Sequence, residues 1–288
     1  MNTLLSDIKR ALTSWGFIAG LAGTCAALFF GSIDTILPAL QAGTQGGNMA
    51  GFHEQVLFGG LASNVMLFCA PILAALPYTA AFVEEYKSGY LKESLPRAGI
   101  RPYIRGKVFA TGISGGLALF AGIILAYIAF ALLFTPIEIA PPPVDASSMD
   151  KAMAVSSEMQ AAQPSMFMQI IGRGFLFFLS GFFWSVVGAL FAVITMSRYL
   201  AYAFPFILYY VLVMLCQRYF TGLFILNPQE WLNPVSSWPG GTWGISLFLG
   251  EIILIVSVCY AVSIRKRLAK STKSPKGFRV FGKAGRET

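Results

Sequence analysis

The sequence predicts an all-α integral membrane protein, and the prediction rests on its composition and on its long apolar runs. Hydrophobic residues make up 56% of the 288 residues and charged residues only 12%, with a mean hydropathy of +0.67. A soluble domain usually carries about twice that charged fraction. The spans are expected to be helices, because no stretch shows the regular alternation typical of membrane β-strands.

Six apolar runs are long enough to cross the membrane as helices, since about 30 Å of hydrocarbon takes roughly 17 to 25 residues. They are 15–37, 56–83, 108–134, 168–196, 200–216 and 243–264. Together they define one six-helix transmembrane domain, 1–264, which is followed by a basic tail, 265–288. The tail lacks an apolar core, so we expect it to lie on anionic lipid or to be disordered.

The segment before the first run predicts a short helix lying in the membrane interface. One face carries Leu4, Leu5, Ile8 and Leu12, and the other carries Asp7, Lys9 and Arg10. Such a division is typical of an interfacial helix, although a plain extension of the first span fits the same residues. A secretory signal peptide is the competing interpretation, and the lack of a clean small-x-small cleavage site favours a retained helix.

The distribution of basic residues predicts that both termini are cytoplasmic. Eighteen of the twenty-one Lys and Arg residues then lie inside, and only Lys151, Arg173 and Arg218 lie at or near the outside. This orientation puts the charged segment 84–107 in the cytoplasm and the loop 135–167 outside, where exposed helices and a disordered loop are both open. The outer loop 217–242 holds two tryptophans and three prolines, which favours a re-entrant segment before the last helix.

Several function classes are excluded. The net charge of +8 reports orientation in a membrane protein, so no nucleic-acid partner is predicted. The four cysteines lie in or beside apolar runs without paired or metal-ligand spacing, so they are interpreted as packing residues. With His53 as the one histidine and no G-x-x-x-x-G-K-[ST] loop, the chain is not predicted to be an enzyme or to carry its own ATPase.

Glu251 is the one acidic residue well inside an apolar run. An ionisable group in the membrane is a functional candidate because burying it costs a few kcal/mol. Glu251 either lines a translocation pathway or pairs with Arg173 at a similar depth in the fourth span, and the sequence leaves both open. Asn64 and Tyr209 are further pathway candidates, although each also suits a hydrogen bond between helices.

Small residues recur at spacings that let membrane helices approach closely. We expect such contacts at Gly16 and Gly20, at Gly112 and Gly116, and at Gly174, Gly181 and Gly188. In the second span Pro71 and Pro77 remove backbone donors, so a kink is predicted there.

The segment 84–107 is a charged insert between two apolar runs and carries six Lys and Arg residues. Its apolar residues nevertheless follow helical spacing. Glu84 and Glu85 suit a positive helix N-terminus, and Pro96 with Gly99 is expected to end the helix. Such an amphipathic helix either docks a partner or lies on the lipid surface.

The order Glu85-Tyr86-Lys87-Ser88-Gly89, followed by Lys92, Leu95, Gly99-Ile100-Arg101 and Lys107, resembles the second cytoplasmic segment of ABC-2 family permeases, especially antibiotic-peptide and lantibiotic exporters. The resemblance implies a coupling helix that docks on a separate ATPase subunit. The docking residues that it implies are Glu84, Glu85, Gly89, Lys92, Arg97, Arg101 and Lys107. This chain departs from the family at Tyr90, where Thr is common, and at Arg101-Pro102, where Ser-Arg is common.

The same resemblance implies a function: a permease subunit of an ATP-driven exporter in the bacterial plasma membrane. Its expected partners are membrane lipid, two copies of an ATPase that binds ATP and magnesium, and a second permease subunit, identical or related. The cargo is expected to be an amphipathic or hydrophobic peptide, lipid or drug. The alternative is a polytopic binding or immunity protein that has no ATPase partner.

Overall fold

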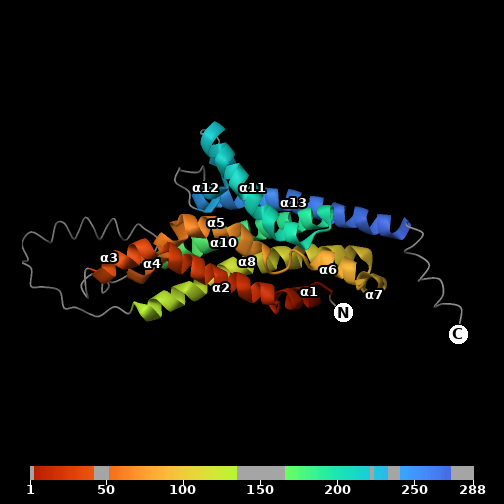
Figure 1. The fold of residues 1–288 in the computed structure, drawn as a ribbon, viewed down its shortest axis with the longest axis horizontal. Helices are drawn as coiled ribbons and strands as arrows, with labels where there is room; N and C mark the ends of the chain where they lie inside the picture. Colours follow the sequence, from red (N-terminus) through yellow and green to blue (C-terminus); the bar gives the residue numbers. More distant parts are fainter. Residues whose placement is uncertain (1–2, 42–51, 135–165, 221–223, 233–240, 274–288) are drawn as a thin grey trace, which may run out of the picture.

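The computed structural model describes residues 3–41, 52–134, 166–220, 224–232 and 241–273 (Figure 1). These residues form helices and connecting turns, with no strand among them. Four helices are long and apolar enough to cross a membrane: α8 (Ile100–Leu133), α10 (Met166–Thr195), α11 (Arg198–Tyr219) and α13 (Gly241–Lys273). The predicted all-α membrane protein is therefore confirmed.

Two further pairs of helices have the length and composition of single spans but are bent. The helices α1 (Thr3–Leu12) and α2 (Trp15–Gly31) meet at 52°, and α4 (Phe52–Ala62) and α5 (Asn64–Ala75) meet at 69°. Counting each pair as one span raises the number of candidate spans from four to six. A further short helix, α3 (Ile33–Gln41), follows α2 after a break at Ser32.

A serine begins the second helix of each bent pair. Ser14 and Ser63 have extended backbones, and their side chains accept hydrogen bonds from the N–H groups of Phe17 and Met66, at 3.1 and 3.3 Å. This is N-capping, which satisfies a donor that the helix start leaves free. The second span, in which a kink was predicted at Pro71 and Pro77, is bent by 69° at Ser63, and its helix is interrupted by turns at 76–80, which include Pro77, whereas Pro71 lies inside α5.

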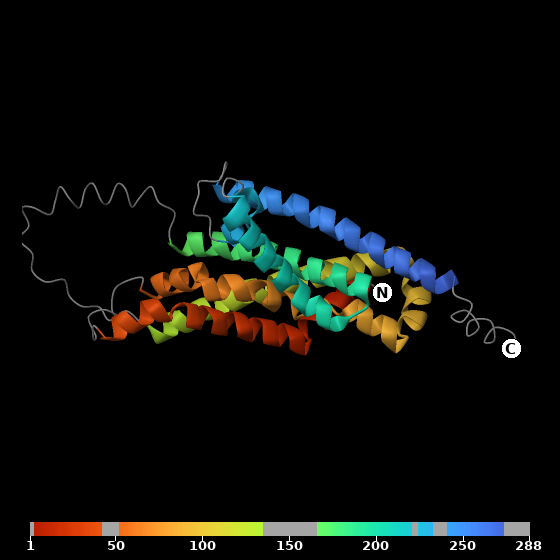
Figure 2. The same ribbon diagram turned by 45° about the horizontal axis from the view of Figure 1, so that its top comes forward.

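The helices α8 and α10 pack against each other through the middle of the bundle (Figures 1 and 2). A Cβ atom added to Gly181 would lie 2.8 Å from the carbonyl oxygen of Gly115, and one added to Gly116 would lie 2.6 Å from that of Phe178. Two turns further along α10, a Cβ at Gly188 would lie 2.6 Å from the Ala201 carbonyl oxygen of α11. The close contacts predicted at these glycines are confirmed.

One end of the bundle gathers elements that are far apart in the sequence. The helices α1, α6 (Ala81–Ser88) and α7 (Leu91–Ala98) lie there beside the C-terminal end of α13 (Figures 1 and 2). One buried cluster joins Phe82 of α6, Leu91 of α7, Tyr103 of α8, Ala201 of α11 and Leu268 of α13. The two chain ends that the structure describes therefore lie on the same side.

The last helix runs further than its apolar run. Although the sixth span was predicted to end at Ile264, α13 continues to Lys273, so residues 265–273 of the tail are helical. Arg267 anchors this extension by donating hydrogen bonds to the carbonyl oxygens of Val193, at 3.2 Å, and Ile194. The rest of the predicted tail, 274–288, lies outside the described residues, as does the external loop through residue 165.

Part of the predicted re-entrant loop is described. It contains a short 3₁₀ turn, η2 (Phe224–Leu226), and a five-residue helix, α12 (Pro228–Leu232). Trp231 is buried and donates a hydrogen bond to the carbonyl oxygen of Ile225, at 2.7 Å. The segment is therefore folded back on itself and packed, rather than extended.

Candidate functional site

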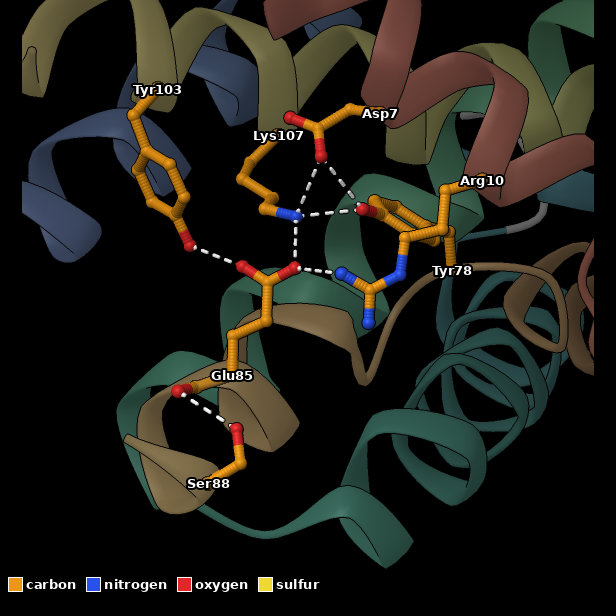
Figure 3. Close-up of polar contacts among 7 residues, drawn as sticks. All are labelled: Asp7, Arg10, Tyr78, Glu85, Ser88, Tyr103 and Lys107. Carbon is orange, nitrogen blue, oxygen red and sulfur yellow. Dashed lines mark hydrogen bonds and ion pairs between the residues drawn. The ribbon is translucent and has the colours of Figure 1, made fainter. Parts of the chain in front are cut away.

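Lys107 of α8 is the centre of a buried polar network (Figure 3). Its side chain is only 1% exposed, yet its ammonium group donates to three oxygens. They are Glu85 Oε1 at 2.7 Å, the Tyr78 hydroxyl at 2.6 Å and Asp7 Oδ1 at 3.0 Å. All three ammonium protons thus have acceptors, which is what a buried lysine requires.

Glu85 of α6 is the second hub of the network. Its side chain is 2% exposed, and Oε1 accepts a further hydrogen bond from Arg10 Nη1 at 2.8 Å. Its other oxygen, Oε2, accepts from the Tyr103 hydroxyl at 2.8 Å. The carboxylate is therefore satisfied on both oxygens although it is almost completely removed from solvent.

Tyr78, in the turn between α5 and α6, joins the two halves of the network. Its hydroxyl accepts from Lys107 and donates to Asp7 Oδ1 at 3.0 Å. Burial, together with the nearby carboxylates of Asp7 and Glu85, raises the pKa of the Tyr78 hydroxyl above its usual range. Tyr78 therefore keeps its proton and remains a donor to Asp7.

The network ties three separate elements into one joint. Asp7 and Arg10 come from α1, Glu85 from α6, and Lys107 with Tyr103 from one face of α8. Two carboxylates meet two cations, so the group is formally neutral, and the burial of Glu85 and Lys107 is tolerable only while these two remain paired. The network therefore attaches α6 to both α8 and α1.

Small residues let these elements come close enough for the network to form. A Cβ atom added to Gly106 of α8 would lie 2.8 Å from Asp7 Oδ2, so α1 rests directly on α8 at this position. At the end of α1, the Ser14 hydroxyl lies within donating distance of the carbonyl oxygens of Ala11 and Pro77, at 2.7 and 3.1 Å. The end of α1 is thus also held against the turn that precedes α6.

The predicted coupling helix is divided in two. Gly89 has φ +78° and separates α6 from α7, whereas one continuous amphipathic helix was expected. Gly99, with φ +77°, ends α7 as predicted and donates its N–H to the Leu95 carbonyl oxygen at 2.9 Å. The segment is therefore a pair of short helices with left-handed glycines at both joints.

Substitution of Gly89 by alanine is expected to cost about 1–2 kcal/mol of stability, because a residue with a Cβ is strained at a positive φ. An added Cβ would meet no atom within 4 Å, so backbone strain is the whole effect. Thermal unfolding in detergent measures it. Gly172→Ala is the matched control, since Gly172 is also in open space but helical, and an equal loss in both variants would contradict the prediction.

The structure separates the predicted docking residues into two sets. Glu85 and Lys107 are buried in the network, whereas Glu84 and Arg101 are exposed. Gly89 forms the joint between α6 and α7. Lys92 and Arg97 belong to α7, and their side chains lie outside the described part of the structure. Among the docking residues whose side chains the structure describes, Glu84 and Arg101 are therefore accessible to a partner.

A cleft of about 600 Å³ runs along the exposed side of α6. The link between α10 and α11 forms its other wall, so the cleft is lined by Val83, Glu84, Lys87, Ser88, Met196, Ser197, Arg198 and Tyr199. The sequence analysis missed Arg198 and Tyr199 as members of this surface. The sequence feature that could have indicated this surface was Arg198, the single basic residue in the very short link between the fourth and fifth spans.

The four candidate pathway residues do not form one site. The Arg173 guanidinium lies 4.9 Å from the ring centre of Phe58, and Glu251 is exposed on α13, so the structure does not bring these two together. Asn64 accepts a long hydrogen bond of 3.5 Å from Gln229. Tyr209 is buried against aromatic side chains of the core.

The chemistry available at the joint is electrostatic and mechanical. Among the described residues no group of three or more His, Cys, Asp or Glu is placed to hold a metal ion. Comparisons of the chain with protein-family models, with curated proteins and with solved structures found no match. The fold and the site are those of an all-α protein with helices long and apolar enough to cross a membrane, in which a buried charged joint fixes α6 while Glu84 and Lys87 on the same helix stay exposed.

Proposed function

We propose that the chain is the permease subunit of an ATP-driven exporter in the bacterial plasma membrane, with six spans and both termini in the cytoplasm. The gathering of α1, α6, α7 and the end of α13 at one end of the bundle supports this orientation. Together with the first turns of α8, which lie at the same end and carry Arg101, Arg105 and Lys107, these elements hold thirteen of the twenty-one Lys and Arg residues, as expected for a cytoplasmic face. Each bent helix pair then counts as one span, and α12 belongs to the outer re-entrant segment.

The proposal rests on one observation: a buried ion pair attaches α6, which has an exposed face, to the long apolar helix α8. Glu84 and Lys87 face the cleft beside α6, while Glu85, the neighbour of Glu84, is locked to Lys107 of α8. A partner that pushes on α6 therefore moves α8. The tight glycine contacts pass this movement on to α10.

The partner would be a separate ATPase, present in two copies and binding ATP with magnesium. A second permease subunit, identical or related, would complete the pathway. Closure of the two ATPases on ATP would press on the α6–α7 segments and open an outward route between the permeases, which is alternating access in the general sense. The cargo class is an amphipathic or hydrophobic peptide, lipid or drug.

The docking surface is tested by exchanging the two exposed charges of α6 in the variant E84K/K87E. The exchange keeps the net charge and leaves the buried network intact, since neither side chain belongs to it. Reversed charges face the partner's complementary groups, so association with the ATPase is expected to weaken roughly tenfold and transport-coupled ATP hydrolysis to fall with it. Co-purification and ATP hydrolysis measure both, with a candidate ATPase that lacks membrane spans and is sought among the neighbouring genes.

Arg218→Glu is the matched control, because Arg218 is exposed at the opposite end of α11. It is expected to leave assembly and hydrolysis unchanged. If the wild type, E84K/K87E and the control bind the ATPase equally well and support equal ATP hydrolysis, α6 is not the docking surface. A chain that binds its ligand and protects cells with no ATPase present would instead support the binding or immunity protein.

A further inference from the structure

An apolar groove runs along the outside of the joint, between α1 and the first turns of α8. Its volume is about 480 Å³. Its walls are mostly apolar and are lined by Leu4, Leu5, Pro102, Arg105, Gly106, Phe109 and Ile113. The groove lies outside the polar network and outside the cleft beside α6, so the proposed export mechanism does not use it.

The apolar walls remain open to the surroundings of the protein. Leu5 is 64% exposed and Phe109 is 49% exposed, although both are large hydrophobic residues. Gly106, one of the lining residues, adds no side chain to the groove. A ligand that contributes a hydrocarbon chain would cover these surfaces.

Two arginine side chains lie at one end of the groove. Arg105 lines it and is exposed, and Arg101, also exposed, lies one helical turn earlier on α8. None of the lining residues is a carboxylate, and Asp7 of α1 is turned inward to Lys107 and Tyr78.

Charge and apolar surface are arranged in order along α8. Arg101 and Arg105 come first, and Phe109 and Ile113 follow, each one turn further into the apolar run. Arg105 and Ile113 are separated by about 12 Å along the helix axis. A molecule with an anionic head and an apolar tail would fit this order if it lay parallel to α8, with its head at the arginines and its tail along the apolar residues.

We infer that this groove is a binding site for an anionic phospholipid, with its phosphate on Arg101 and Arg105 and one acyl chain along Leu5, Phe109 and Ile113. Clustered basic residues beside a membrane helix are suited to anionic headgroups. A free phosphate would leave the apolar walls uncovered. A peptide would place unsatisfied backbone groups against them.

The site is tested on the full chain in detergent by native mass spectrometry, with phosphatidylglycerol or phosphatidylcholine of identical acyl chains added back. Phosphatidylglycerol is expected to bind more tightly. Each arginine removed is expected to weaken its binding about fivefold, so R101Q/R105Q should lose roughly 25-fold. Phe109→Ala is expected to weaken both lipids alike, because it removes a contact to the acyl chain.

Arg218→Gln is the matched control for charge, since it removes an exposed arginine far from the groove, and it is expected to change binding less than twofold. The inference would be overturned by equal affinity for the two lipids, or by equal losses in R101Q/R105Q and R218Q. Displacement of phosphatidylglycerol by soluble glycerol phosphate at similar concentrations would also overturn it, since this would show a site for phosphate alone. The readout is lipid binding, so it is independent of any ATPase.

Discussion

Replacement of Lys107 by methionine is expected to lower the free energy of unfolding by about 3–5 kcal/mol. Methionine has a similar length and no charge, so the substitution leaves the carboxylates of Glu85 and Asp7 without their shared cation. Glu85 is 2% exposed, and water cannot replace the lost partner. Thermal unfolding of the purified protein in detergent, together with the yield of folded protein, measures the loss.

Two single variants set the scale for this result. Arg10 also pairs with Glu85, but its side chain is 56% exposed, so Arg10→Gln is expected to cost at most about 1 kcal/mol. Arg105→Gln, on the exposed side of α8, is expected to leave stability unchanged. The double variant K107M/E85Q should recover part of the loss, because it removes a charge from each side of the pair. A K107M protein as stable as R105Q would contradict a structural role for the network.

The apolar runs that form the long helices, and the glycines at which helices come close, could be predicted because both depend on local sequence. Hydrocarbon thickness fixes how many apolar residues a helix needs, and a glycine stripe marks a close neighbour whichever helix supplies it. The bend at Ser63 escaped prediction although its signal was local. Pro71 lies well inside α5, whereas Ser63 offers an N-cap that ends one helix and begins the next.

The candidate site could be predicted only in part because adjacent helical residues point about 100° apart. Glu84 and Glu85 are neighbouring residues of the same type, yet Glu84 faces the cleft and Glu85 is buried against Lys107. Which of them turns inward depends on where α1 and α8 pack. Asp7 supplies an essential oxygen from a hundred residues away, and no pattern in 84–107 indicates it.

Under the proposed function, this division would let one short segment serve two purposes. The exposed residues of α6 would contact the partner, whereas Glu85 keeps α6 attached to α8. Gly89, four residues after Glu85, ends α6 through its left-handed backbone, and the Ser88 hydroxyl donates to the Glu85 carbonyl oxygen at 3.3 Å. The α7 helix can therefore take a different direction while the joint at Glu85 stays fixed.

Replacement of Gly181 by leucine is expected to destabilise the protein by about 3 kcal/mol, because it overpacks the crossing of α8 and α10. The first added atom alone would lie 2.8 Å from the Gly115 carbonyl oxygen and 3.0 Å from the Gly116 Cα atom. Both are backbone atoms, so the contact is relieved only if the two helices move apart. Loss of folded protein and a lower unfolding temperature in detergent measure the effect.

Gly172→Leu is the matched control, because Gly172 lies on the same helix and an added Cβ there meets no atom within 4 Å. Leucine has a higher helix propensity than glycine, so this variant is expected to be as stable as the wild type or slightly more stable. A similar loss in both variants would show that α10 rejects leucine for reasons unrelated to the crossing. A loss confined to Gly181→Leu establishes that the contact between α8 and α10 holds the two central spans together, which the transmission of movement from α6 requires.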